Sequence, residues 1–433
     1  MIKLIYGATL LLLTATALAE ETRPTVYDPD PQHLLNRLYT AIATRVEGGE
    51  RFGVDNVTPF YEPFDDSAQV AALAEELIAS KAVLSSLSDL KRALLLHDVW
   101  TAFDTAAAFK DRKTLRPLAR AVRVLAMDDQ SIARLPDNYE AAAKSGAFLR
   151  DFNPTNPDRA FLPPDLFDPQ GPWVQIGETG TGHPLARMHV DAASARSAFM
   201  VFIRCPGGRE ATLAYLNALN LFRAPFTLSE NPIGTRYDPD GKHPVRMDVV
   251  RINPQTPQIP AGTIFSLVRQ MAVVNDKLQP VMTKITQSVQ FRVYKTNDWD
   301  FTRDSREAFA RSQSPFEITM TRADLLAGRA GGLHRVADDE AFPTLAGIVR
   351  LEWTRAQRLK GHVVMPTCPL CHSGSGILSV NTYTARFDRE RNLLDRGPSL
   401  MPADYPEYQR ETTMARKRQR YEWGVLQGLL ADD

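Results

Sequence analysis

Six prolines fall within residues 153–172, in the stretch "NPTNPDRAFLPPDLFDPQGP", and they limit what this part of the chain can form. Proline fixes φ and has no backbone N–H, so it interrupts helices and central strands. We therefore expect a linker here, or an extended segment laid across the surface of two domains. The sequence changes character across this stretch, which predicts a different architecture on each side of it.

The region before the prolines, residues 20–152, has the apolar spacing of amphipathic helices. In "DSAQVAALAEELIASK", Val70, Leu73 and Leu77 recur at helical intervals, and Asp66 or Ser67 is placed to cap the first turn. This pattern continues through Leu90 and Leu94 and again through Leu118, Val122 and Leu125. We expect a helical N-terminal region.

The local sequence predicts the positions of two residues in this region, His97 and Pro117. His97 falls at the apolar spacing of "SDLKRALLLHDVWTAFDTAAAF", which favours a hydrogen-bonded core histidine over a ligand. Pro117, in "TLRPLARAVRVLAM", fits best in the first turn of its helix, where the missing N–H has no intrahelical partner.

The region after the prolines, residues 173–300, contains short runs rich in β-branched and aromatic residues, such as "SAFMVFIRC" and "SVQFRVYK". Such runs predict a mostly antiparallel sheet, interrupted by one helix at "EATLAYLNALNLF". Cys205, at the end of one run, is expected to be a small buried hydrophobe. The fold class is therefore α+β. We divide the chain into a signal peptide at 1–19, a helical region at 20–152, the linker at 153–172, a β-rich region at 173–300 and a mixed C-terminal region at 301–433.

The charge of the chain excludes some partners. Lysine plus arginine number 51, as do aspartate plus glutamate, so no global field attracts nucleic acid. The basic run "ARKRQR" at 415–420 is expected on the solvated face of a C-terminal helix.

The first 19 residues resemble an export signal. A short basic region at Lys3 precedes an apolar run from Leu4 to Leu18, and small residues follow at the positions that a signal peptidase reads. We therefore expect an exported protein, periplasmic or secreted, with no integral membrane segment after cleavage. An uncleaved N-terminal anchor is the alternative.

The stretch "MPTCPLCHSGSG" carries the clearest chemical motif. Cys368 and Cys371 are spaced C-x-x-C, and His372 follows directly. This segment resembles the haem attachment site of c-type cytochromes, and the resemblance covers only this stretch. It implies one covalently bound haem c, with thioether bonds from the two cysteines and His372 as the proximal iron ligand. It also implies one-electron transfer with an unknown redox partner protein. The protein would then act as an electron carrier or binding protein more than as a catalyst.

The second axial ligand of such a haem is expected farther along the chain. Met401, in "GPSLMPAD", resembles the distal-ligand loop of many c-type cytochromes, and the alternative is an ordinary packed or exposed methionine. The flanks of the motif depart from a small cytochrome, because "GHVVMPT" before it and "ILSVNTYTARF" after it both indicate strands.

Other chemistry can use the same residues. Cys368 and Cys371 could form a local or redox-active disulfide, or a metal site together with His372, although no second ligand pair accompanies them. A separate hypothesis is a non-haem Fe(II) oxygenase, in which His189 and Asp191 form an H-x-D pair on a strand and His243 completes a facial triad.

Overall fold

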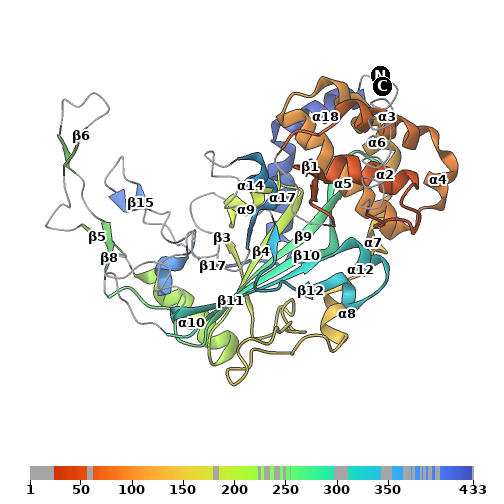
Figure 1. Cartoon of the computed structure of the whole chain (residues 1–433). Helices are drawn as coiled ribbons and strands as arrows, with labels where there is room; N and C mark the ends of the chain where they lie inside the picture. Colours follow the sequence, from red (N-terminus) through yellow and green to blue (C-terminus); the bar gives the residue numbers. More distant parts are fainter. Residues whose placement is uncertain are drawn as a thin grey trace, which may run out of the picture.

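The computed structural model is an α+β protein, as the sequence predicts: helices gather at the N-terminal side and pack on a large antiparallel sheet (Figure 1). The predicted signal peptide, Cys368, Cys371 and His243 lie outside the part of the chain that the structure describes. That part comprises residues 24–55, 62–178, 185–222, 226–228, 235–237, 244–246, 250–253, 255–296, 311–342, 354–363, 372, 376–380, 383, 387–388, 393–394 and 400–431.

The helical layer is built from amphipathic and buried helices. The longest of them, α5 (Asp89–Ala108), packs against α6 (Arg112–Leu125), and α6 packs against α3 (Ser67–Ala79). Asp66 caps α3 by accepting hydrogen bonds from two backbone N–H groups, which confirms one of the two predicted caps. The other helices here are α2 (Leu34–Ala43), α4 (Lys81–Ser86), α7 (Asp129–Ala133) and α8 (Asn138–Lys144).

Within the described residues, the main sheet has seven strands in the order β12-β11-β10-β9-β4-β3-β17, and every neighbouring pair is antiparallel. It takes strands from both the 173–300 and the 301–433 ranges. Their bounds are β3 (Val174–Glu178), β4 (Ser197–Arg204), β9 (Ile264–Val274), β10 (Pro280–Tyr294), β11 (Gln313–Met320), β12 (Leu333–Arg335) and β17 (Met401–Pro402).

Four small antiparallel pairs accompany the main sheet in the β-rich and C-terminal ranges, and a fifth lies in the N-terminal region. They are β1 (Arg45–Glu47) with β2 (Glu50–Phe52), β5 (Phe226–Leu228) with β8 (Val250–Ile252), β6 (Thr235–Tyr237) with β7 (Pro244–Arg246), β13 (Ala341–Phe342) with β14 (His362–Val363), and β15 (Phe387–Asp388) with β16 (Leu393–Leu394).

Alternation along the strands gives the sheet two different faces. On β10, Phe291 and Val293 point into the core shared with the helical layer, whereas Tyr294 belongs to a second apolar cluster. That second face is covered by α10 (Gly208–Leu221), the predicted middle helix, and by residues near Ile377. The helical layer and α10 thus cover opposite faces of the sheet.

The proline-rich segment has neither helix nor central strand, as expected, but it packs into the core. Phe161, Leu162 and Leu166 are buried. The ring centroid of Phe161 lies 4.5 Å from that of Phe291 and 5.5 Å from that of Phe316, both on the sheet. The segment is therefore held by its aromatic and aliphatic residues.

His97 is a core histidine, as predicted. Its Nδ1 donates to the carbonyl oxygen of Ala272 at 2.9 Å, and its Nε2 lies 3.1 Å from the amide of Gln287. Burial holds the pKa of this imidazole well below its usual value.

The prediction that Pro117 occupies a first turn is wrong. Helix α6 begins at Arg112, because Asp111, six residues before Pro117, caps the helix by accepting a hydrogen bond from the backbone N–H of Lys113. Pro117 therefore sits inside the helix, where it removes one backbone donor.

The prediction of a solvated basic face at 415–420 holds for the exposed Arg418 but is wrong for Lys417. This run ends α17 (Tyr408–Arg418), which is followed by α18 (Tyr421–Ala431). Lys417 is fully buried and donates a hydrogen bond to Asp104 of α5, which also accepts one from the buried Arg196 next to β4. We name Asp104, Arg196 and Lys417 the buried charge cluster. It joins the helical layer, the sheet and the C-terminal helices.

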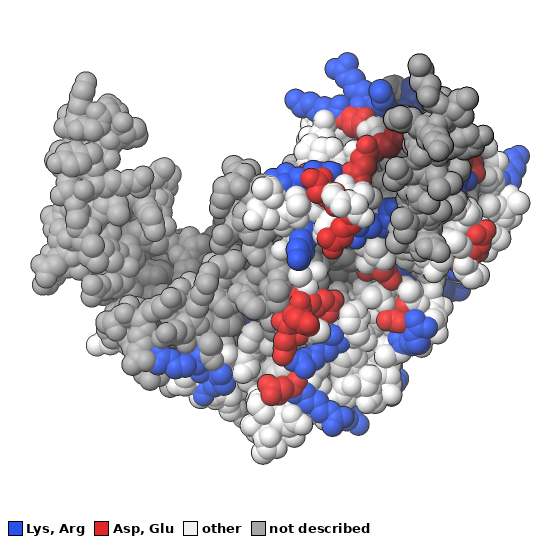
Figure 2. All heavy atoms as spheres, viewed as in Figure 1, with Lys and Arg blue, Asp and Glu red and all other residues white. Residues whose placement is uncertain are grey.

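Acidic and basic side chains lie interspersed on the face drawn in Figure 2. Among the described residues, none of the helices combines the length and apolarity needed to cross a membrane.

Replacing Asp104 with asparagine should destabilise the protein strongly, because the substitution leaves two buried cations without a carboxylate. We expect a loss of about 3–5 kcal/mol in the free energy of unfolding, measured by urea denaturation. The matched control is Lys277→Met, which breaks the exposed ion pair with Asp129 and should have little effect. Equal effects of the two substitutions would contradict a structural role for the cluster.

Candidate functional site

The residues after the C-x-x-C-H motif pack on the second face of the sheet. The strand predicted for "ILSVNTYTARF" is wrong at its start, because Gly376–Ser379 form a short 3₁₀ helix. A 3₁₀ helix has three residues per turn, so Ile377 and Val380 face the same way, whereas strand alternation would separate them. Both join the apolar cluster with Tyr383 and Tyr294. The motif is thereby followed by a firmly anchored segment.

The carbonyl oxygen of Ser379 fixes the orientation of His372. It accepts a hydrogen bond from Arg292 Nη1 at 3.0 Å and lies 2.9 Å from His372 Nδ1. Because a carbonyl oxygen can only accept, Nδ1 must carry the proton. The lone pair of the imidazole then resides on Nε2. Ser379 is itself held by a 2.6 Å hydrogen bond between its hydroxyl and that of Tyr294.

The surroundings of His372 keep it neutral. Burial lowers the pKa of the imidazole to about 3, and the nearby charge of Arg292 adds to this effect. A protonated His189 would also repel a protonated His372. His372 is therefore a neutral imidazole at physiological pH, with Nε2 available as a base or a metal ligand.

His189 and Asp191 lie on α9 (Arg187–Ala192), a short helix, and not on the predicted strand. Residues two apart on a helix diverge by about 200°. Asp191 points to α17, where Arg416 binds both of its carboxylate oxygens at 2.7 Å. The structure thus separates two of the three residues in the oxygenase hypothesis. Across the described ranges, no group of three or more His, Cys, Asp and Glu side chains could hold a metal ion.

His189 occupies a different environment from Asp191. Its ring lies 5.4 Å from that of Phe199 on β4, centroid to centroid. Burial lowers the pKa of His189 to about 4, and the charges of Arg269 and Arg292 on the second sheet face add to this shift.

Met401 lies on the edge strand β17, where it pairs with Glu178 of β3. Its side chain is 37% exposed, while the preceding Leu400 packs into the cluster with Ile377 and Val380. The role of Met401 as a distal ligand stays a prediction. Cys205 is a free, buried thiol, as predicted, and burial raises its pKa.

Sequence reasoning missed a buried carboxyl group on the same sheet face. Glu317 of β11 stands opposite Gln290 of β10 and is buried. Burial raises the pKa of Glu317 to about 7, against the weaker opposing effects of a hydrogen bond from Gln290 and the charge of Arg269. Burial also lowers the pKa of Arg269 to about 9. From Phe316 on, apolar and polar residues alternate in "QSPFEITM". This alternation indicates a strand and could have placed Glu317 on one face of the sheet.

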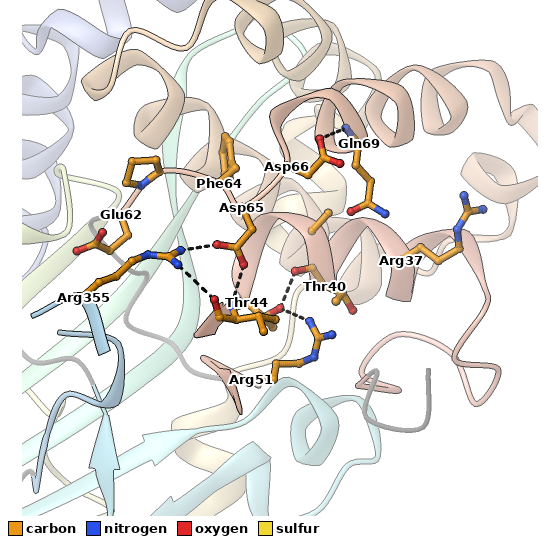
Figure 3. Close-up of a pocket in the computed structure, with 13 residues that line it drawn as sticks. Arg37, Thr40, Thr44, Arg51, Glu62, Phe64, Asp65, Asp66, Gln69 and Arg355 are labelled. Carbon is orange, nitrogen blue, oxygen red and sulfur yellow. Dashed lines mark hydrogen bonds and ion pairs between the residues drawn. The ribbon is translucent and has the colours of Figure 1, made fainter. Parts of the chain in front are cut away.

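Two cavities lined by described residues lie away from His372. The larger, about 930 Å³, is drawn in Figure 3 between α2, the start of α3 and α14 (Arg355–Lys360). Its charged walls are Arg37, Arg51, Arg355, Glu62, Asp65 and Asp66, so it has no dominant sign. The smaller, about 270 Å³, is lined by Thr319, His334 and Glu340 among others.

Comparison with known proteins returns no relative. No protein-family model matches the chain, and neither a curated protein nor a solved structure matches it.

Glu317→Gln should stabilise the protein above pH 7. A carboxyl group whose pKa is raised in the folded state binds its proton more tightly there, so stability falls as pH rises from the unfolded pKa, near 4.5, to about 7. The amide removes this loss, which is on the order of 3 kcal/mol at about 1.4 kcal/mol per pKa unit. Urea denaturation at pH 5 and pH 8 checks this. The exposed Glu210→Gln is the control, and a wild-type pH dependence in Glu317→Gln would contradict the account.

Proposed function

We propose that this chain carries one c-type haem, attached through thioether bonds at Cys368 and Cys371, with His372 as an axial iron ligand. In this proposal the protein is exported and exchanges single electrons with a redox partner protein. The C-x-x-C-H spacing supports the attachment, since thiols at this spacing add to the two vinyl groups of a haem.

The observation that carries the proposal is the hydrogen bond from His372 Nδ1 to the carbonyl oxygen of Ser379. Histidines that bind metals usually donate their other ring N–H to a carboxylate or carbonyl oxygen, which fixes the tautomer and the ring orientation. His372 has this arrangement, and its low pKa keeps the remaining nitrogen unprotonated. His372 and its hydrogen-bond partner Ser379 therefore fit the arrangement of an iron-bound imidazole.

The surrounding residues supply the rigidity that such a ligand needs. Arg292 donates to the same carbonyl oxygen, and its guanidinium lies over the rings of Phe265 and Tyr294 at 5.7 and 5.8 Å from their centroids. Ser379 is fully buried. A haem bound here supplies one-electron chemistry, while the chain orients the proximal imidazole through Ser379 and places a cation beside it.

Covalent haem is tested by exporting the protein in a bacterium competent for cytochrome c maturation, denaturing it and staining for haem. We expect the wild type to retain haem after denaturation. Cys368→Ala and Cys371→Ala should each weaken the covalent attachment, and the double variant should abolish it.

The matched control is Cys205→Ala, which removes the buried cysteine and should leave the haem stain unchanged. A colourless wild-type polypeptide with the mass of the bare chain would overturn the proposal. If its mass is instead two hydrogen atoms below that of the reduced chain, the two cysteines form a disulfide.

A further inference from the structure

Helix α6 carries a concentration of positive charge in a chain that is neutral overall. Residues 105–127 include six lysines and arginines and one acidic residue, whereas the two signs balance at 51 each over the whole chain. Successive residues of an α-helix are about 100° apart, so five of the six cations fall within one arc of about 100°. They are Arg112, Lys113, Arg116, Arg120 and Arg123. The helix therefore has a basic stripe on the side opposite its buried residues.

Contacts within the protein occupy the C-terminal half of this stripe. Arg120 forms an ion pair with Glu75 of α3, with 2.9 Å between the nitrogen and the oxygen. Arg123 donates a hydrogen bond to the carbonyl oxygen of Leu430 in α18. These two cations help to join α6 to the helices beside it.

The N-terminal half of the stripe is open to solvent. Lys110, Arg112 and Lys113 are exposed, and their side chains make no ion pair or hydrogen bond within the described part of the chain. Asp111, the acidic residue among them, is already engaged, because its carboxylate accepts from the backbone N–H of Lys113 and from the hydroxyl of Ser67. The positive charge at this end is therefore not neutralised by neighbouring side chains.

Helix stability does not account for cations at this end of α6. The N-terminus of a helix has a partial positive charge, so Arg112 and Lys113 are unfavourable in its first turn. Arg112 and the exposed Arg116 are four residues apart, a spacing at which like charges repel. A negatively charged binding partner would offset both effects.

An aromatic ring lies next to these cations in the chain. Phe109 ends α5, directly before Lys110, and is 39% exposed. We name Phe109, Lys110, Arg112, Lys113 and Arg116 the basic corner. It lines neither of the two cavities described above, so a ligand enclosed in a cavity does not suit it. Exposed aromatic rings among lysines and arginines are typical of protein surfaces that rest on anionic bilayers, where the ring enters the headgroup region and the cations bind phosphates.

We propose that the basic corner is a peripheral docking surface for an anionic phospholipid bilayer. The cations attract the negatively charged headgroups, and the ring of Phe109 lodges between them. The surface acts independently of His372 and of any haem, so its test and that of the proposed function are separate.

Docking is tested by co-sedimentation of the purified protein with vesicles at low ionic strength. We expect binding to mixed phosphatidylglycerol and phosphatidylcholine vesicles, and release at about 1 M salt, where the screening length falls to about 3 Å. Pure phosphatidylcholine vesicles report any binding through the apolar run at 4–18, which needs no anionic lipid. Equal binding to both kinds of vesicle, or no binding to either, would overturn the proposal.

The combined variant Lys110→Gln, Arg112→Gln and Lys113→Gln removes cations that have no partners to lose, so it should fold with the stability of the wild type. At about fivefold for each cation near an anionic surface, its partition coefficient should fall on the order of 100-fold. Phe109→Ser should weaken binding to the same vesicles, because the ring no longer enters the headgroup region. Unchanged binding in either variant would refute the docking surface.

A matched control removes the same charge elsewhere. Lys144, Lys284 and Arg329 are exposed and lie around α8, apart from α6 in Figure 1. Their combined replacement by glutamine should leave vesicle binding close to that of the wild type. A loss as large as that of the basic-corner variant would show a net-charge effect and contradict the proposal. Tighter binding of the wild type to duplex DNA than to the vesicles would make nucleic acid the partner and also contradict it.

Discussion

Asp104 joins three parts of this structure, because its buried carboxylate in the helical layer accepts hydrogen bonds from one residue beside the sheet and from one in the C-terminal helices. It sits on α5, while Arg196 directly precedes β4 and Lys417 lies in the last turn of α17. Among the described residues, neither cation has another acidic partner as close. Burial lowers the pKa of Lys417 to about 8 despite the carboxylate. Removing the carboxylate exposes the full desolvation penalty of both cations.

This arrangement has a consequence for the candidate site. The buried charge cluster fixes α17 beside β4, and Arg416 of the same helix binds Asp191 on α9. His189 is two residues from Asp191, so its position depends on a chain of ion pairs that starts at Asp104. The helical layer fills one face of the sheet, and these contacts position His189 on the other.

Periodicity and capping were enough to predict the α+β class, the helix capped by Asp66 and the core role of His97, because each depends on local spacing. The sequence could not predict that Lys417 is buried, since its partner Asp104 is 313 positions away. It also suggested a strand where Gly376–Ser379 form a 3₁₀ helix, because Ile377 and Val380 fit an apolar run of either kind. For the site, the motif identified His372, whereas the roles of Ser379 and Arg292 beside it, and the buried Glu317 on the same sheet face, required the fold.

The central claim is that His372 is held as a neutral imidazole with its lone pair on Nε2. It is tested most directly by ¹⁵N NMR of the imidazole rings in protein produced without haem, with His372→Gln used to assign the signals. The account predicts a neutral ring protonated at Nδ1 that keeps this form as the pH is lowered to 5, because its pKa is about 3. A ring protonated at Nε2, or one that becomes an imidazolium near pH 6.5, would contradict it.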